Sequence, residues 1–113
     1  MSESCVIAVT DDQFQREVRE HPGVVLVDFY TPECGPCRMM APVLEDICTE
    51  RRESLKVVKI NAMENHQVAL DHQIQAVPTL VLYQNGQRIA ECRGYQAKPV
   101  FEKWLDDAMA RGA

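Results

Sequence analysis

The sequence lacks the features that would assign it to several large functional classes. No apolar run approaches the roughly 20 residues that a helix needs to cross a bilayer. Lys and Arg number 12 against 17 Asp and Glu, and the formal net charge of −5 predicts no nucleic-acid-binding surface. No repeat, low-complexity tract or Ser/Gly-rich linker interrupts the chain. We therefore expect one domain over residues 1–113, with neither a membrane nor a nucleic acid as partner.

Cysteine is present, but in odd number. The five cysteines are Cys5, Cys34, Cys37, Cys48 and Cys92. Because an odd number cannot all pair within one chain, we expect no structural disulfide framework and a reducing compartment. The first residues contain neither the basic n-region nor the apolar h-region of a signal peptide. Both observations predict a cytoplasmic protein.

Local patterns predict alternating strands and helices. Val24–Tyr30 is a continuous, β-branched apolar run typical of a buried strand. Thr10 and Gln13 form a capping-box pattern, and Asn85-Gly86 is a strong hairpin signal. Strands are expected at 5–9, 24–30, 55–60, 78–83 and 88–93, and helices at 10–20, from the cysteine pair to about 50, at 65–73 and at 98–110. This order predicts an α/β fold, with a mixed five-stranded sheet flanked by four helices.

Cys34-Gly35-Pro36-Cys37 carries the chemistry, at the point where the buried strand ends and the long helix begins. Residues three apart on a helix have Cβ atoms about 5–6 Å apart. A small adjustment then reaches the roughly 3.5–4.5 Å of a disulfide. Free N–H groups and the positive end of the helix dipole favour a thiolate at Cys34. Pro36 is tolerated in the first turn, and Gly35 leaves the approach open to a partner's backbone.

We therefore expect Cys34 to be the exposed nucleophile and Cys37 the buried resolving thiol. The alternative for this spacing is half of a zinc site. Zinc needs about four ligands, and no second CxxC, CxxH or HxxxH is present. His66 and His72 are six residues apart and would not share a helix face. We expect no metal.

The sequence resembles the thioredoxin family, in order and at family spacing over nearly the whole chain. The resemblance is carried by Val25–Phe29, Cys34–Pro42, Lys59-Ile60-Asn61, Val77-Pro78-Thr79, Asn85-Gly86 and Gly94. It implies the thioredoxin fold and a protein-disulfide reductase that acts in electron transport and cell redox homeostasis. It also implies that no cofactor is bound, that the Cys34–Cys37 disulfide is reversible, and that electrons come from an NADPH-dependent thioredoxin reductase. Disulfide-containing client proteins are the implied partners of a monomer.

The resemblance also implies roles for residues outside the cysteine motif. Asp28 would be a buried carboxyl of raised pKa that carries protons for Cys37, and Lys59 would sit near it. The alternatives are a strand-end aspartate bonded to backbone and a solvated lysine. Pro78 would be a cis-proline facing the cysteines, rather than a trans proline at a strand start. Val77 would pair with an extended substrate, and Gly94 would keep the docking surface flat.

One residue departs from the family pattern. Glu33 stands where the family usually has tryptophan directly before the first cysteine. A carboxylate beside the nucleophile disfavours the thiolate, so we expect a Cys34 pKa above the family norm. Alternatively, Glu33 points to solvent and changes only the choice of partner. With Gly35, Pro36, Val77, Pro78 and Gly94, it completes the expected substrate-binding surface.

The sequence leaves open the roles of three cysteines and two alternatives to a reductase. Cys5 and Cys48 are expected to be small core residues, and Cys92 is either another or a site of regulatory oxidation or glutathionylation. The alternatives to a reductase are an oxidase or isomerase, or a redox-inactive or weakly active docking subunit. Gly35-Pro36 favours reduction, whereas Glu33 supports docking.

Overall fold

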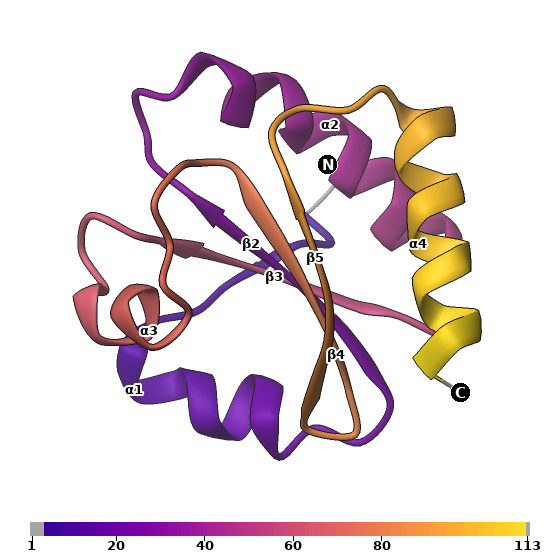
Figure 1. The fold of residues 1–113 in the computed structure, drawn as a ribbon, viewed down its shortest axis with the longest axis horizontal. Helices are drawn as coiled ribbons and strands as arrows, with labels where there is room; N and C mark the ends of the chain where they lie inside the picture. Colours follow the sequence, from indigo (N-terminus) through magenta and orange to yellow (C-terminus); the bar gives the residue numbers. More distant parts are fainter. Residues whose placement is uncertain (1–3, 113) are drawn as a thin grey trace.

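The computed structural model describes residues 4–112, which form a central sheet with helices on both faces (Figure 1). The strands are β1 (Ile7–Ala8), β2 (Val24–Tyr30), β3 (Lys56–Asn61), β4 (Thr79–Gln84) and β5 (Gln87–Arg93). The helices are α1 (Asp11–Phe14), which continues into the π-helical turn η1 (Gln15–Arg19), α2 (Gly35–Glu50), α3 (His66–Asp71) and α4 (Lys98–Gly112). None of the helices in this part of the chain is both long and apolar enough to span a membrane.

The sheet is mixed, in the order β1-β3-β2-β4-β5. β3 pairs in parallel with both β1 and β2, whereas β4 runs antiparallel to β2 and β5. At the β4–β5 turn, Asn85 and Gly86 have φ values of 50° and 80°, the conformation that a tight hairpin requires. The expected five-stranded α/β fold with four flanking helices is confirmed.

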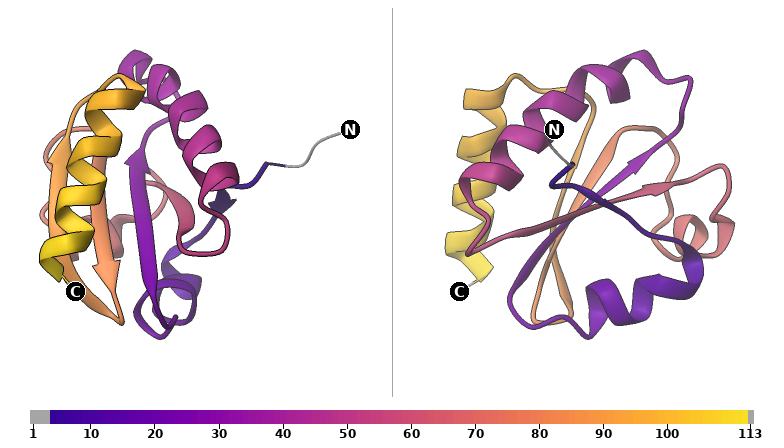
Figure 2. Two further views of the ribbon diagram at one scale, coloured as in Figure 1. Left: turned by 90° about the vertical axis from the view of Figure 1, so that its right-hand side faces the viewer. Right: turned by 180° about the vertical axis from the view of Figure 1, so that it is seen from behind.

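Alternation along β2 divides the core into two layers. Val25, Val27 and Phe29 pack with α1, η1 and α3, while Leu26 packs on the other face with α2 and α4. Figures 1 and 2 show α2 and α4 close together at one side of the sheet, and α1 and α3 close together at the other. Asp28 is two residues from Leu26 and therefore faces α2, the helix that carries the cysteine pair.

The first strand is shorter than expected, because the backbone of Cys5 and Val6 bonds to a side chain instead. The Glu45 carboxylate on α2 accepts hydrogen bonds from Cys5 N at 2.9 Å and Val6 N at 3.3 Å. Only Ile7 and Ala8 are left to pair with β3. Residues 4–6 therefore belong to the α2 layer.

The expectation that no structural disulfide forms is wrong. Cys5 and Cys48 form a disulfide with their Cα atoms 5.9 Å apart, although 43 residues separate them in the sequence. The predicted core position is right for Cys48, whereas Cys5 is only half-buried and packs against the core. The expectation that both thiols are free is wrong. An odd cysteine count leaves room for two pairs, and Cys92 is the free cysteine.

Candidate functional site

Cys34 lies at the N-cap of α2, and the helix start shapes its surroundings. Its Sγ accepts a hydrogen bond of 3.1 Å from the backbone N–H of Cys37. Pro36 lies in the first turn, where its missing N–H has no helical partner. Cys34 and Cys37 form a disulfide, with their Cα atoms 5.2 Å apart. A helix N–H aimed at the first sulfur is the arrangement that stabilises a thiolate there.

The two cysteines differ in their exposure to solvent. Cys37 is 5% exposed, whereas Cys34 is half-buried. Glu33, Gly35 and Pro36 are all exposed around Cys34. An incoming disulfide can therefore reach Cys34 first, while Cys37 is shielded beneath it.

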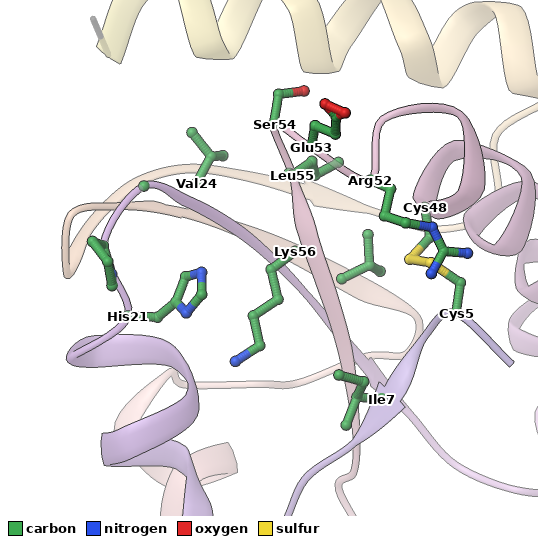
Figure 3. A pocket seen from close by; sticks show the side chains of 13 residues that line it. Cys5, Ile7, His21, Val24, Cys48, Arg52, Glu53, Ser54, Leu55 and Lys56 are labelled. Carbon is green, nitrogen blue, oxygen red and sulfur yellow. A yellow bond between two sulfur atoms is a disulfide. The ribbon is translucent and has the colours of Figure 1, made fainter.

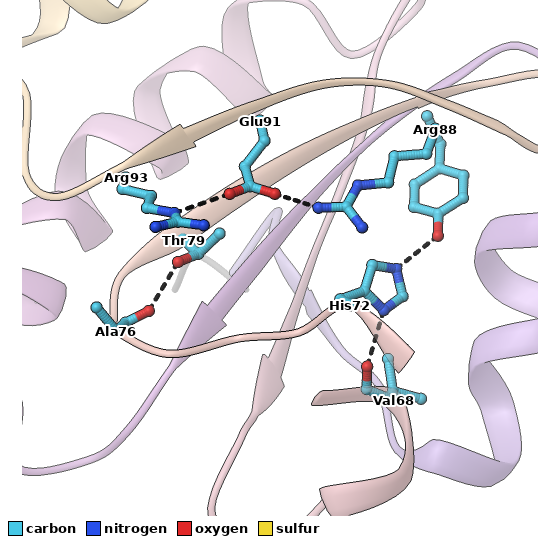
Figure 4. A network of polar contacts seen from close by, with 8 residues as sticks. Val68, His72, Ala76, Thr79, Arg88, Glu91 and Arg93 are labelled. Carbon is cyan, nitrogen blue, oxygen red and sulfur yellow. Dashed lines mark hydrogen bonds and ion pairs between the residues drawn. The ribbon is translucent and has the colours of Figure 1, made fainter. Parts of the chain in front are cut away.

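A second wall of the site comes from the segment before β4. The Val77–Pro78 peptide is cis, as the resemblance predicted. The Val77 carbonyl oxygen lies 3.7 Å from Cys34 Sγ. The Thr79 hydroxyl donates to the Ala76 carbonyl at 2.7 Å and holds this segment at the start of β4 (Figure 4). Backbone polar groups thus lie directly beside the reactive sulfur.

Gly94 supports this wall through its backbone. Its N–H donates to the Pro78 carbonyl at 2.8 Å, and its φ of 84° lies in the region that favours glycine. A Cβ placed on Gly94 would meet no heavy atom within 4 Å. The need for glycine at this position therefore arises from the backbone conformation rather than from crowding.

Asp28 is a buried carboxyl close to the cysteine pair. It is 4% exposed, and its Oδ1 has no hydrogen-bond partner among the described residues. Burial raises its pKa to about 7, against the opposing effect of the Lys59 charge. Asp28, Lys59 and Cys37 line one cavity of about 160 Å³. Asp28 is therefore a carboxyl that can exchange a proton near neutral pH, and it faces the same cavity as Cys37.

Lys59 is the neighbour of Asp28 across the sheet. The two residues pair in the parallel β2–β3 register, so their side chains share a face. Lys59 is half-buried, and its Nζ lies 5.6 Å from the centre of the Tyr30 ring. The lysine thus places a positive charge beside the carboxyl, which favours its ionised form.

Sequence reasoning missed two residues that shape the site. The Arg38 guanidinium donates from Nε and Nη2 to the Pro32 carbonyl, at 3.1 and 2.9 Å, and so ties the loop before Cys34 to the helix after it. Glu45 binds the segment before β1, as described above. Arg38 lies only four residues after Cys34, so a role for it near the cysteine pair could have been suspected. Glu45 is about 40 residues away in sequence from Ser4, Cys5 and Val6, and no local pattern links it to them.

Cys92 lies apart from this chemistry. It is 7% exposed, and its Sγ accepts a hydrogen bond of 2.7 Å from Gln96 Nε2. Burial raises the pKa of the thiol, which opposes thiolate formation. Within residues 4–112, no group of three or more His, Cys, Asp or Glu side chains is placed to hold a metal ion.

Comparison with known proteins agrees with this geometry. The family model described as thioredoxin matches residues 5–107. The chain is 44% identical over 103 residues to "Thioredoxin 1" of Synechococcus elongatus, covering 91% of this chain and 96% of the relative. It is 45% identical over 101 residues to "Thioredoxin" of Pyropia yezoensis, covering 89% and 94%. It is 40% identical over 106 residues to "Thioredoxin" of Mycobacterium tuberculosis, covering 94% and 91%. The chain therefore belongs to the thioredoxin family of thiol–disulfide oxidoreductases.

Proposed function

We propose that this protein, as a single domain, reduces disulfides of client proteins, with Cys34 as nucleophile and Cys37 as resolving thiol. The observation that carries the proposal is the position of Cys34 at the N-cap of α2. There its Sγ accepts a hydrogen bond from the Cys37 N–H, and Cys34 as a residue is more exposed than Cys37. A thiolate stabilised at an accessible position attacks first, and the neighbouring shielded thiol acts second.

The reaction proceeds in two exchanges. The Cys34 thiolate attacks one sulfur of the client disulfide, so that a Cys34–client bond forms and the client S–S bond breaks. The departing client thiolate takes up a proton. Cys37 then loses its proton, attacks Cys34 Sγ and expels the second client thiolate, which is protonated in turn. Two electrons pass from the protein dithiol to the client, and the Cys34–Cys37 disulfide remains.

Asp28 is our candidate acceptor for the Cys37 proton. A base is most effective when its pKa lies near the working pH, and burial raises that of Asp28 to about 7. The cavity shared by Asp28 and Cys37 provides space for a proton to pass between them. Lys59 is a positioning residue, because its charge favours the ionised carboxylate that accepts the proton.

The client would bind along the wall formed by Val77 and Pro78. Cys34 Sγ lies 3.7 Å from the Val77 carbonyl, so an extended segment bonded to Cys34 would meet that backbone. Glu33, Gly35, Pro36 and Gly94 complete this surface in our proposal. We further propose that the protein acts as a cytoplasmic monomer in electron transport. It would bind no cofactor and would receive electrons from an NADPH-dependent thioredoxin reductase.

Reduction of insulin disulfides tests the proposal. The protein should accelerate insulin reduction by dithiothreitol, and by NADPH with a thioredoxin reductase, whereas Cys34→Ser should abolish both activities. Cys92→Ala is the matched control, because it removes a buried cysteine outside the site and should retain activity. Wild-type protein that is inactive in both assays, with Cys34 and Cys37 free, would refute the proposal.

A docking subunit is the second candidate, favoured by the exposed carboxylate of Glu33 beside the nucleophile. Cys37→Ser separates the two functions, because without the resolving thiol the first exchange stops at the mixed disulfide. Covalent capture of client proteins, reversed by dithiothreitol, supports exchange. Capture of noncovalent partners only, unaffected by dithiothreitol, supports docking.

A further inference from the structure

The Cys5–Cys48 disulfide ties the beginning of the described chain to the last turn of α2. Glu45, three residues before Cys48, holds the same segment by accepting hydrogen bonds from the Ser4 hydroxyl and from the N–H groups of Cys5 and Val6. Burial opposes ionisation of Glu45, but these hydrogen bonds outweigh it and lower the pKa of the carboxyl. One covalent bond and one charged hydrogen-bond acceptor therefore fasten residues 4–6 to one face of α2. We call this arrangement the N-terminal clamp.

The clamp closes over the buried carboxyl of the functional site. Val6, which is 8% exposed, lines a cavity of about 30 Å³ together with Asp28, Glu45 and Lys59. The remaining wall of that cavity comes from Ala41 and Leu44 on α2. Val6 is bracketed by the disulfide on one side and by the β1–β3 pairing on the other, where Ala8 pairs with Lys59. The segment is thus part of what separates Asp28 from water.

One end of the disulfide is open to small molecules. Cys48 is buried, whereas Cys5 is half-buried. Both residues line a cavity of about 390 Å³ on the surface between β1 and the end of α2 (Figure 3). That volume is within the range of small-molecule sites. Arg52 and Lys56 also line it, and Figure 3 shows the Arg52 guanidinium extending toward the disulfide. A positive charge there would favour Cys48 as a departing thiolate.

We propose that Cys5–Cys48 is a second thiol–disulfide site, which exchanges with low-molecular-weight thiols. When the disulfide is closed, it holds Val6 over Asp28 and excludes water from that carboxyl. This inference deepens the proposed role of Asp28. Reduction of the disulfide leaves residues 4–6 held only by Glu45 and by the adjoining β1–β3 pairing. Water then reaches Asp28, and the pKa that burial raises to about 7 falls toward its ordinary value of 3.8. The carboxyl becomes a weaker base for Cys37.

The opening reaction balances with two small thiols. The first, as thiolate, attacks the Cys5 sulfur, so that a mixed disulfide forms at Cys5 and Cys48 leaves as a thiolate that takes a proton. A second thiolate attacks the small-molecule sulfur of that mixed disulfide and releases Cys5, which is protonated in turn. The two small thiols are oxidised to their disulfide, and the protein gains two electrons and two protons. Closure by a small disulfide is the reverse.

Alkylation tests the exchange. In Cys34→Ser/Cys37→Ser protein, unfolded in the presence of a maleimide and weighed by mass spectrometry, the air-oxidised chain should carry one label, at Cys92. After equilibration with excess reduced glutathione it should carry three. Three labels in the air-oxidised protein would show that the disulfide does not form, and one label at every glutathione concentration would show that it does not exchange. Either result overturns the proposal.

A carboxyl titration tests the coupling to Asp28. The ¹³C resonance of Asp28 is followed against pH in the same double variant before and after clamp reduction, with Cys92→Ala in that background as the matched control. We expect the pKa of Asp28 to fall by about one pH unit or more on opening, and to be unaffected by the control. Equal pKa values in the closed and open forms would overturn the coupling. Neither measurement requires turnover, so the outcome is independent of the insulin assay.

Discussion

Replacing Asp28 with asparagine should stabilise the folded protein by an amount that grows with pH. Burial raises the pKa of Asp28 from 3.8 to about 7, against the opposing effect of Lys59. A rise of that size corresponds to about 4 kcal/mol. Between these two values the folded chain holds a proton at Asp28 that the unfolded chain has released. The stability contributed by the proton is therefore complete below about pH 4 and lost as the pH rises to about 7. Asparagine, which has no charge, escapes this loss.

The assay is urea unfolding of air-oxidised protein, so that both disulfides are closed in wild type and variant. The free energy of unfolding is measured for each at pH 4 and at pH 8.5. At each pH the free energy of unfolding of wild type is subtracted from that of the variant, and the two differences are then compared. The cost of burying the amide is the same at both pH values, so it cancels in this comparison. We expect that change to be about 4 kcal/mol in favour of the variant.

Asp12→Asn is the matched control, because it makes the same chemical change at an exposed position. Its difference from wild type should vary by less than about 1 kcal/mol over the same range, as for a surface carboxylate in the first turn of a helix. If Asp28→Asn shows no more pH dependence than Asp12→Asn, Asp28 is ionised in the folded protein at ordinary cost. Both its proposed proton transfer and its coupling to the N-terminal clamp would then lose their basis.

Two further predictions concern Glu33 and the buried His72–Tyr83 pair. Glu33→Gln should lower the pKa of Cys34, because it removes a negative charge beside the thiolate. Titration of thiolate absorbance in the reduced protein measures this pKa. An unchanged pKa would mean that Glu33 affects only the choice of partner. Tyr83→Phe should destabilise the fold by about 1–3 kcal/mol, because His72 Nε2 lies 2.5 Å from the Tyr83 hydroxyl and would lose that partner (Figure 4). Urea unfolding measures the second effect, and a loss below about 0.5 kcal/mol would mean that water replaces the hydroxyl.

The strands and the cysteine site could be predicted because their signals are local. The buried run Val24–Tyr30 and the Asn85-Gly86 turn each specify a conformation over a few neighbouring residues. Cys34 and Cys37 are three residues apart at the start of α2, so the N-cap and first turn of one helix bring them together. For these features the chain needs no information from distant residues.

The features that could not be predicted depend on distant residues. Nothing within a few positions of Cys5 indicates that it meets Cys48, and the parity of the cysteine count excludes only complete pairing. Similarly, the helix expected at 65–73 includes His72, which lies at the C-cap of α3, but this expectation does not reveal its partners. His72 is 3% exposed, and its Nδ1 bonds the Val68 carbonyl while Nε2 faces Tyr83 on β4. Burial lowers the pKa of His72 and keeps it neutral in this apolar layer.

The same distinction separates the two halves of the proposed mechanism. Thiolate stabilisation at Cys34 comes from the first turn of α2, so any chain with this motif at a helix start acquires it. The proton affinity of Asp28 instead depends on what covers it, and its cover comes from α2, from Lys59 on β3 and from Val6 before β1. Relatives that share the cysteine motif can therefore differ in the second exchange through residues remote from it. In this chain the cover is fastened by a disulfide, so the basicity of Asp28 responds to the redox state of a pair of cysteines outside the catalytic motif.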